Sequence, residues 1–337
     1  MAKIGDVARR AGVSTATVSR ALSNPDSVRP ETRKLVLDAV RELGYTPNAA
    51  ARNLRAGRSR MLLTVVPLLS NSFFARIVSG IDQEASRRGY GTIISEESPD
   101  SVEKQAHLLD LAAAGLFDGV LLLSALMPRV GRRSLADMGM PLVRVCSRRE
   151  PGAGAVLLEE REATLIQTRH LLGLGHRRFM YISGGAGNIN DIPRYEGFCE
   201  AIAEAGLQPD QQIRVEGFFD FASGTAAAHR FLELRAEGRA PTAIVAVGDQ
   251  MAIACMKGIQ EAGLRIPEDV SIVGFDGIDF TNYCQPTLTT IVQPAEDMGA
   301  AAAGLLIDML QGERDPGEIV FPATLRVAGS TGPAPAG

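Results

Sequence analysis

The chain has 337 residues, which is longer than one hydrophobic core usually serves, so two or three domains are expected. Its composition, 45% hydrophobic, 5% aromatic and without tryptophan, is typical of an α/β protein and excludes a disordered or disulfide-rich one. The net charge of −4 conceals an asymmetry: residues 1–60 hold twelve Lys or Arg against five acids, or +7, and the remainder carries −11. A basic module at one end is the electrostatic pattern expected for binding a phosphate backbone.

Three classes of feature are missing from the sequence. The four cysteines, Cys146, Cys199, Cys255 and Cys284, lie far apart and show neither metal-ligand nor disulfide spacing. The chain opens without an apolar signal segment, and no run approaches the roughly 20 apolar residues of a membrane span. We therefore expect a cytoplasmic protein with no membrane partner, no metal and no cofactor.

The first 43 residues predict three short helices, because apolar residues recur at helical spacing with breaks at Gly12 and at residues 24–26. Gly12 permits a tight turn, and Ser14 is a capping residue for a second helix that begins at Thr15. This pattern predicts a helix-turn-helix, although a surface helix pair without a ligand has the same spacing. The terminal position and the charge of +7 favour DNA binding.

In a helix-turn-helix, the first residues of the second helix meet base edges, while hydroxyls and backbone amides contact phosphates. Arg20 can bind guanine through two hydrogen bonds, and Thr15 and Ala16 offer a hydroxyl and a contact for the thymine methyl group. The stretch 48–57 is Ala-rich, opens with a capping Asn and closes with a Gly, which predicts a linker helix.

From residue 61 onward, short β-branched runs alternate with amphipathic helices, which predicts βαβ units and parallel sheets. Eight strands are predicted, at residues 61–68, 90–95, 119–124, 142–146, 178–183, 213–217, 243–248 and 270–276. Eight strands are many for one open sheet, which favours two lobes.

The segments DVARRAGVSTATVSRAL and VRPETRKLVLDAVRELGYTPNAAARNL closely resemble the lactose-repressor/galactose-repressor (LacI/GalR) family. The likeness continues through LGLGHRRFMYISG, RYEGFCEAIAEAGL, AIVAVGDQMAIACMKGIQEAGLRIPEDVSIVGFDGID and PTLTTIVQP. It implies an all-α helix-turn-helix domain at residues 1–47, a hinge helix and linker at 48–60, and an effector-binding and dimerisation domain at 61–337. That α/β domain is expected to have two Rossmann-like lobes of periplasmic-binding-protein type I architecture. The N-lobe would be about residues 61–160 plus 291–320, and the C-lobe about 161–290 plus 321–337.

The resemblance further implies a regulator, usually a repressor, that binds double-stranded operator DNA of palindromic sequence. A tail without leucine heptads after Ser330 favours a homodimer over a coiled-coil tetramer. Leu54 would enter the minor groove and kink the duplex, from a hinge helix too short to be stable alone in water; an ordinary apolar linker residue is the alternative. The predicted DNA-binding residues are Ser14, Thr15, Ala16, Thr17, Ser19, Arg20, Asn48, Arg52, Leu54 and Arg55.

A small-molecule effector is expected in the cleft between the lobes, because ligands of open α/β sheets bind beyond the carboxyl ends of strands. By resemblance, Asp276 accepts hydrogen bonds from hydroxyls, Arg194 lies beside it, and Phe219 stacks on the ligand. The alternative roles are a turn cap for Asp276, a surface ion pair for Arg194, and helix packing for Phe73 and Phe74. The predicted effector-binding residues are Ser70, Phe73, Phe74, Asn188, Arg194, Phe219, Asp249 and Asp276.

Some positions depart from the family pattern: Ser72 stands where Pro is usual, Gly248 where Asn is common, and Glu159–Glu160 in place of an Asp–Asn pair. The segments GFDGIDFTNYCQPTLTTIVQP and GFFDFASG resemble those of a nucleoside-responsive member of the family, so the resemblance implies a small sugar or a nucleoside as the effector. An enzyme is not expected, since no P-loop, nucleophile elbow or metal-ligand spacing appears. A solute-binding protein that serves a transporter is a further alternative, against which the basic module argues.

Overall fold

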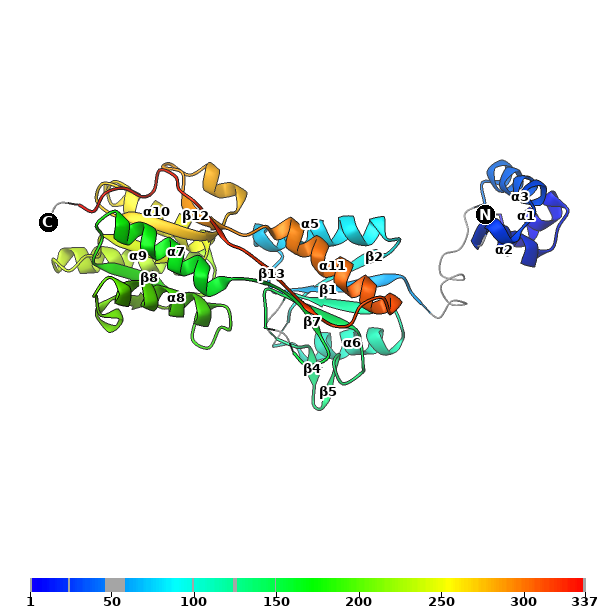
Figure 1. The fold of residues 1–337 in the computed structure, drawn as a ribbon, viewed down its shortest axis with the longest axis horizontal. Coiled ribbons are helices and arrows are strands. Elements are labelled where there is room, and N and C mark those ends of the chain that lie inside the picture. The colour runs from blue at the N-terminus through cyan, green and yellow to red at the C-terminus, as the bar shows by residue number, and fades with distance from the viewer. Residues whose placement is uncertain are drawn as a thin grey trace. The chain divides into compact units, whose positions relative to one another are not determined.

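The computed structural model describes residues 2–23, 25–45, 58–98, 100–123, 126–148 and 150–335. The chain divides into two compact units, residues 1–59 and 60–337 (Figure 1). Within the described residues, no helix is both long and apolar enough to cross a membrane.

The first unit is a bundle of three helices around a small core. They are α1 (Ile4–Ala11), α2 (Thr15–Ser23) and α3 (Pro30–Leu43), with a 3₁₀ turn, η1 (Pro25–Ser27), before the third. Gly12 ends α1 in the left-handed conformation with φ 68°, as its role in the turn requires. Pro30 opens α3 at a position where its missing N–H costs nothing. The core consists of Val7, Ala8, Val18, Ala21, Val36 and Ala39, which confirms the three predicted helices.

The second unit contains two six-stranded sheets, each in its own lobe. The sheet of the N-lobe is wholly parallel, in the order β13 (Glu318–Phe321), β7 (Gly154–Leu158), β6 (Leu142–Val145), β3 (Gly119–Leu122), β1 (Met61–Val66), β2 (Gly91–Glu96). Helices α5 (Ser72–Arg87) and α11 (Ala295–Gln311) cover one face and α6 (Val102–Ala113) the other (Figure 1). Strand β1 is buried on both sides: Leu62 packs toward α5 and α11, and Leu63 toward α6.

The sheet of the C-lobe has the order β14 (Thr324–Arg326), β12 (Thr289–Val292), β11 (Ser271–Asp276), β10 (Ala243–Ala246), β8 (Phe179–Ile182), β9 (Ile213–Val215). Only β14 is antiparallel to its neighbour. Four helices pack on this sheet: α7 (Glu160–Gly173), α8 (Asp191–Glu204), α9 (Phe221–Ala236) and α10 (Asp249–Glu261). Short 3₁₀ turns are η2 (Pro209–Gln211) and η3 (Asp279–Asn282), and a small hairpin of the N-lobe pairs β4 (Arg129–Val130) with β5 (Arg133–Ser134).

The chain passes between the two lobes three times: from β7 to α7, from β12 to α11, and from β13 to β14. The lobes also touch, since Phe275 and Ile278 of the C-lobe belong to the same buried cluster as Phe73 of α5. Arg76 of α5 donates a 3.2 Å hydrogen bond to the carbonyl oxygen of Gly277. All eight predicted strands are present, and the fold confirms the expected pair of α/β lobes behind a helical module.

Candidate functional site

The start of α2 is held by a side-chain cap. The Ser14 Oγ accepts a 3.1 Å hydrogen bond from the backbone N–H of Thr17, and the two hydroxyl oxygens lie 2.9 Å apart. An oxygen in this position satisfies one of the helix's otherwise unpaired N–H groups. The cap predicted at Ser14 is confirmed, and it fixes the end of the helix that would meet DNA.

Behind this cap, α2 has one buried and one exposed side. Val18 is fully buried in the bundle core, whereas Thr15, Ala16 and Arg20 are exposed and Ser19 is half-buried. The residues on the open side are short except for Arg20, so the helix backbone can approach a partner closely. Such a face has the size and chemistry to enter a major groove.

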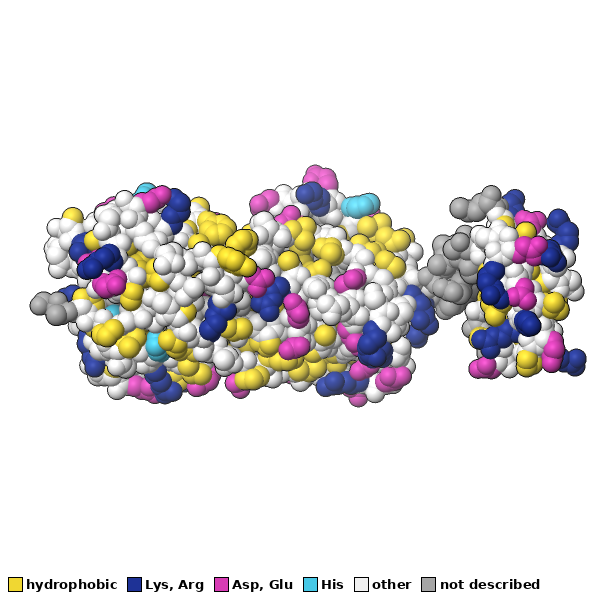
Figure 2. Space-filling model, turned by 90° about the horizontal axis from the view of Figure 1, so that it is seen from above, with side chains coloured by type: hydrophobic (Ala, Val, Ile, Leu, Met, Phe, Trp, Pro, Cys, Tyr) yellow, Lys and Arg dark blue, Asp and Glu magenta, His cyan; other side chains and the backbone are white. Residues whose placement is uncertain are grey.

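Several basic side chains of the helical module are already paired with acids. Arg10 lies 2.7 Å from Glu42, and Arg41 is paired with Asp38. Within the described part of this unit, Arg20, Arg29 and Lys34 have no carboxylate partner. Figure 2 shows the Lys and Arg side chains spread over the visible face of the module, among fewer acids. These three cations are therefore available to an external anion.

Four of the predicted DNA-binding residues, Asn48, Arg52, Leu54 and Arg55, lie outside the described residues. The described structure therefore bears only on the helix-turn-helix part of the predicted DNA-binding set.

In the second unit, Arg194 is the centre of a buried polar cluster between the lobes. Its Nε donates a 2.6 Å hydrogen bond to Glu160 at the start of α7, and its Nη1 donates to the carbonyl oxygen of Val247 at 2.6 Å. The guanidinium carbon lies 3.6 Å from the centroid of the Phe275 ring and 5.8 Å from that of Phe219. Packing against aromatic faces stabilises the cation where water is scarce.

Asp276, at the end of β11, lies in the same cluster. It accepts a 2.8 Å hydrogen bond from the Nε2 of Gln293 and another from the backbone N–H of Asp249. Burial raises the pKa of the Asp276 carboxyl to about 7, against the lowering effect of Arg194 and with a further rise from Glu160. The Oε1 of Gln293 is buried and has no hydrogen-bond partner.

Backbone conformation marks the same place. Cys146, Phe219 and Asp276 each follow or end a strand and have φ of 57°, 60° and 119°, a region that non-glycine residues rarely adopt. The ring of Phe219 lies over Gly184, where an added Cβ would be only 2.2 Å from a ring carbon. Such a conformation costs free energy and persists only where the surrounding structure holds it, and residues of this kind are concentrated at functional sites.

Asp249 is fully enclosed rather than open to the cleft. Its carboxylate accepts hydrogen bonds from the Thr290 hydroxyl at 2.6 Å and from the Ile278 backbone N–H at 2.9 Å. Burial and the nearby Asp276 raise its pKa well above the usual value. The side chain ties the start of α10 to β12 and to the loop after β11, which positions Asp276.

The other predicted effector residues are distributed around the cluster. Phe73 is buried in the apolar cluster shared by the lobes, and Phe74 lies edge-on to it with ring centroids 5.2 Å apart. Asn188 caps the turn before α8, accepting a 2.9 Å hydrogen bond from the backbone N–H of Asn190. Ser70 is exposed.

Sequence reasoning missed three partners in the cluster: Glu160, Gln293 and Cys146. Glu160 departs from the family pattern, which was a usable signal, but its contact with Arg194 depends on how α7 packs on α8. Cys146 lies close enough to the charges of the cluster for them to affect its pKa, which burial raises. With Glu160 it lines a cavity of about 330 Å³ between the lobes.

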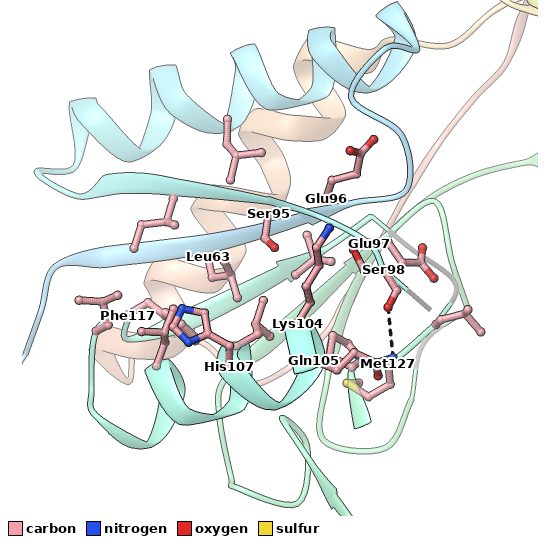
Figure 3. Close-up of a pocket in the computed structure, with 18 of the residues that line it drawn as sticks. Leu63, Ser95, Glu96, Glu97, Ser98, Lys104, Gln105, His107, Phe117 and Met127 are labelled. Carbon is pink, nitrogen blue, oxygen red and sulfur yellow. Dashed lines mark hydrogen bonds between the residues drawn. The ribbon is translucent and has the colours of Figure 1, made fainter. Parts of the chain in front are cut away.

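A larger cavity lies elsewhere, within the N-lobe. It measures about 780 Å³ and runs between β2 and α6, where Lys104, Gln105 and His107 face Ser95 and the residues that follow it (Figure 3). None of the predicted effector residues lines this cavity, and none lines the 330 Å³ cavity, which borders the interlobe cluster at Glu160 and Cys146. The strained backbone and the convergent charges are at the interlobe cluster, so we place the candidate site there despite its smaller volume. Among the described residues, no group of His, Cys, Asp or Glu could hold a metal ion.

Two family models match the chain. One, described as bacterial regulatory proteins of the lacI family, covers residues 3–48, and the other, described as a periplasmic binding protein-like domain, covers residues 168–331. The HTH-type transcriptional repressor CytR of Escherichia coli strain K12 is 35% identical over 339 residues, 98% of this chain and 96% of its own. Catabolite control protein A of Priestia megaterium is 34% identical over 319 residues, 94% of this chain and 95% of its own.

Solved structures agree. The lac repressor dimer bound to operator and the anti-inducer ONPF has a TM-score of 0.86 at 26% identity, over 98% of this chain and 99% of that one. The complex of the transcriptional regulator CelR with cellobiose has a TM-score of 0.72 at 30% identity, over 98% of this chain and 100% of that one.

Proposed function

The chain belongs to the LacI family of bacterial regulatory proteins, and from this premise we propose that it is a homodimer that binds a palindromic operator and responds to a small sugar or nucleoside. As a member of the family it is a DNA-binding transcriptional repressor with an effector-binding domain, and it is not an enzyme. Its site of action in this proposal is the cytoplasm, where the operator is.

On the DNA side, Thr15, Ala16 and Arg20 read base edges in the major groove, while Ser14, Thr17 and Ser19 contact the backbone. The exposed face of α2, with Arg20 unpaired among the described residues, is the observation that carries this proposal. The hinge positions Asn48, Arg52, Leu54 and Arg55 complete the set, with Leu54 in the minor groove.

On the effector side, Arg194, Asp276 and Phe219 contact the ligand directly, and Asp249 positions Asp276. A carboxylate, a guanidinium and an aromatic face together suit a ring that carries hydroxyl groups. Phe73, Phe74, Ser70 and Asn188 form the walls and rim. One similar structure holds cellobiose and another, a regulator from Enterococcus faecium, holds ribose.

Two copies of the chain match the two-fold symmetry of a palindrome. The second unit leaves large apolar side chains open to water, among them Ile94 on the edge strand β2 and Tyr283 after η3, which is 86% exposed. The similar lac repressor structure is a dimer on its operator. Effector binding changes the angle between the lobes of each copy, which shifts the two DNA-binding modules between states that fit the operator well or poorly.

A selection of preferred duplexes from random DNA, followed by fluorescence anisotropy titration, tests this proposal. Wild type is expected to select a palindrome and to bind it at least about 10³-fold more tightly than random DNA. Arg20→Ala should cost about 1 to 3 kcal/mol per half-site and relax the preference at one base pair, with little change on random DNA.

Arg41→Ala is the matched control, since this arginine lies on α3 and is paired with Asp38. It removes the same charge from the module and should leave the base preference unchanged. Equal affinity of wild type for the selected duplex and for random DNA would rule out the operator-binding proposal.

A further inference from the structure

The single guanidinium of the interlobe cluster is already neutralised by a residue of the chain itself. Arg194 and Glu160 form an ion pair with 2.6 Å between Nε and Oε2, and their side chains are 5% and 11% exposed. A pair this deeply buried is held by strong electrostatic attraction, so an incoming anion must compete with a carboxylate that is already in place.

Few donors on Arg194 remain for a ligand. Its Nε is used by Glu160 and its Nη1 by the carbonyl oxygen of Val247. The face of the guanidinium is covered by the Phe275 ring at 3.6 Å. Nη2 has no partner among the described residues, but a fork of two parallel hydrogen bonds through it also needs Nε or Nη1, and both of these already donate to groups of the chain.

Acceptors, in contrast, are in excess. Asp276 receives two hydrogen bonds, whereas a carboxylate has about four acceptor positions. The Oε1 of Gln293, a residue only 1% exposed, has no hydrogen-bond partner among the residues that the structure describes. A buried acceptor without a donor is costly, so the arrangement favours a ligand that brings O–H or N–H groups.

The charged groups around Arg194 also disfavour an anionic ligand. The carboxyl groups of Glu160 and Asp276 lie close to the guanidinium of Arg194 in a buried site, and the buried carboxyl of Asp249 lies next to Asp276. Burial raises the pKa of the Asp276 carboxyl, and the nearby Glu160 carboxylate adds to that rise. An anionic ligand would add a further negative charge to this site.

We propose that Glu160 makes the cleft selective for uncharged or cationic effectors rich in hydroxyl or amino groups, and that it excludes the phosphorylated or carboxylated forms of the same molecules. This inference rests on the proposed effector cleft. It restricts the proposed effectors to unphosphorylated sugars or nucleosides. The selectivity is assigned to Glu160, a residue that departs from the family pattern.

Thermal unfolding with matched pairs of ligands provides the first test. The pairs are cytidine with cytidine 5′-monophosphate, adenosine with adenosine 5′-monophosphate, and ribose with ribose 5-phosphate. Wild type should be stabilised by the neutral member of at least one pair and not by its phosphate. For the pair that binds, Glu160→Gln should improve the affinity for the phosphate relative to the neutral member by about tenfold.

A second arm uses inorganic phosphate and requires no knowledge of the effector. In Glu160→Gln the freed guanidinium should bind the anion and raise Tm by about 2 °C. Wild type, the double variant Glu160→Gln/Arg194→Gln and the control Glu162→Gln should not respond. Glu162 lies in the same first turn of α7 and is exposed. Glu160→Ala serves in place of Glu160→Gln if the latter fails to fold, as judged by circular dichroism.

Stabilisation of wild type by a phosphorylated ligand as strong as by its neutral partner would overturn the proposal. So would a Glu160→Gln variant that responds to inorganic phosphate no more than wild type does. Failure of the proposed function would give a different result. The neutral ligand would still stabilise the protein and the Glu160 variants would behave as predicted, but operator affinity measured by anisotropy would not change when the ligand is added.

Discussion

Asp276 lies in the candidate effector site, and its carboxyl binds a proton more tightly than a carboxyl usually does. Its carboxyl has a pKa of about 7, raised by burial and by Glu160 and opposed by Arg194, Gln293 and the backbone N–H of Asp249. A carboxyl whose folded pKa is raised keeps its proton where the unfolded chain has lost it, so between about pH 4 and 7 it lowers stability as pH rises. Ligand donors that hydrogen-bond to the ionised form compensate for this cost.

Effector affinity should therefore rise with pH through about 7. Below that value, each pH unit is expected to weaken binding by about tenfold, because the proton on Asp276 must leave before a hydroxyl can donate to the carboxylate. Isothermal titration calorimetry between pH 5.5 and 8.5 measures this dependence. Asp276→Asn should bind weakly and without the pH dependence; a wild-type affinity that is flat across the range would show that the carboxyl does not receive the ligand's donors.

The sequence predicted site residues best where a polar or aromatic residue follows the end of a predicted strand. Arg194, Phe219 and Asp276 were predicted from their motifs, and the structure brings them together. Asp249 was also predicted as a ligand-binding residue; its carboxylate is fully buried in the C-lobe and hydrogen-bonded to Thr290 and Ile278, which no pattern of neighbouring residues reveals. Glu160 reaches Arg194 only through the packing of two helices, and that contact depends on tertiary structure.

At the scale of elements, glycines set how closely the helices cross. A Cβ on Gly299 of α11 would lie 2.1 Å from the carbonyl oxygen of Ile77 on α5, and one on Gly197 of α8 would lie 2.1 Å from that of Arg161 on α7. Gly224 makes the same kind of contact between α9 and α10. Each lobe thus depends on at least one helix pair that admits no side chain at its crossing point.

Gly197→Ala is expected to lower the free energy of unfolding by about 1 to 3 kcal/mol, because the backbone of α7 cannot move away as a flexible side chain would. Urea unfolding followed by circular dichroism measures the change. The matched control is Gly173→Ala, also at the α7–α8 pair, where an added Cβ meets nothing within 4 Å; it should stabilise by about 0.4 to 1 kcal/mol. Equal stability of the two variants would contradict the close-crossing argument.

Strand prediction found eight strands and missed others of similar length. The missed strands include β12, β13 and β14, and also β7, which leads almost directly into α7. Length alone does not separate them from the predicted strands, since β9 has three residues as well. Strand β13 alternates between exposed and half-buried positions, as edge strands do.

At the scale of the whole molecule, charge is divided between the units: +7 lies in residues 1–60 and −11 in the rest. The acidic second unit is repelled by the polyanion that the first unit binds. DNA affinity should therefore depend mainly on the cations of the helical module that have no carboxylate partner among the described residues, which include Arg20, Arg29 and Lys34.

Because Arg20 is proposed to read a base, Arg29 and Lys34 supply four phosphate contacts in a dimer, and the logarithm of the DNA association constant should fall against the logarithm of salt concentration with a slope of about −4 or steeper. Lys34→Ala should reduce the magnitude of that slope by about 2, since each dimer loses two contacts. Arg41→Ala, which removes an internally paired charge, should leave it nearly unchanged. Anisotropy titrations from 50 to 300 mM KCl give the slopes, and an unchanged slope for Lys34→Ala would exclude that residue from the interface.

The third passage between the lobes has a consequence for biosynthesis. Strand β13 is an edge of the N-lobe sheet, and α11 covers one of its faces, yet both come from the last 45 residues of the chain. The helical module has its own core and is synthesised first. The DNA-binding module can therefore fold as it emerges from the ribosome, long before the last strands of either lobe have been synthesised. Messages truncated near the 3′ end would yield DNA-binding fragments that no effector can control.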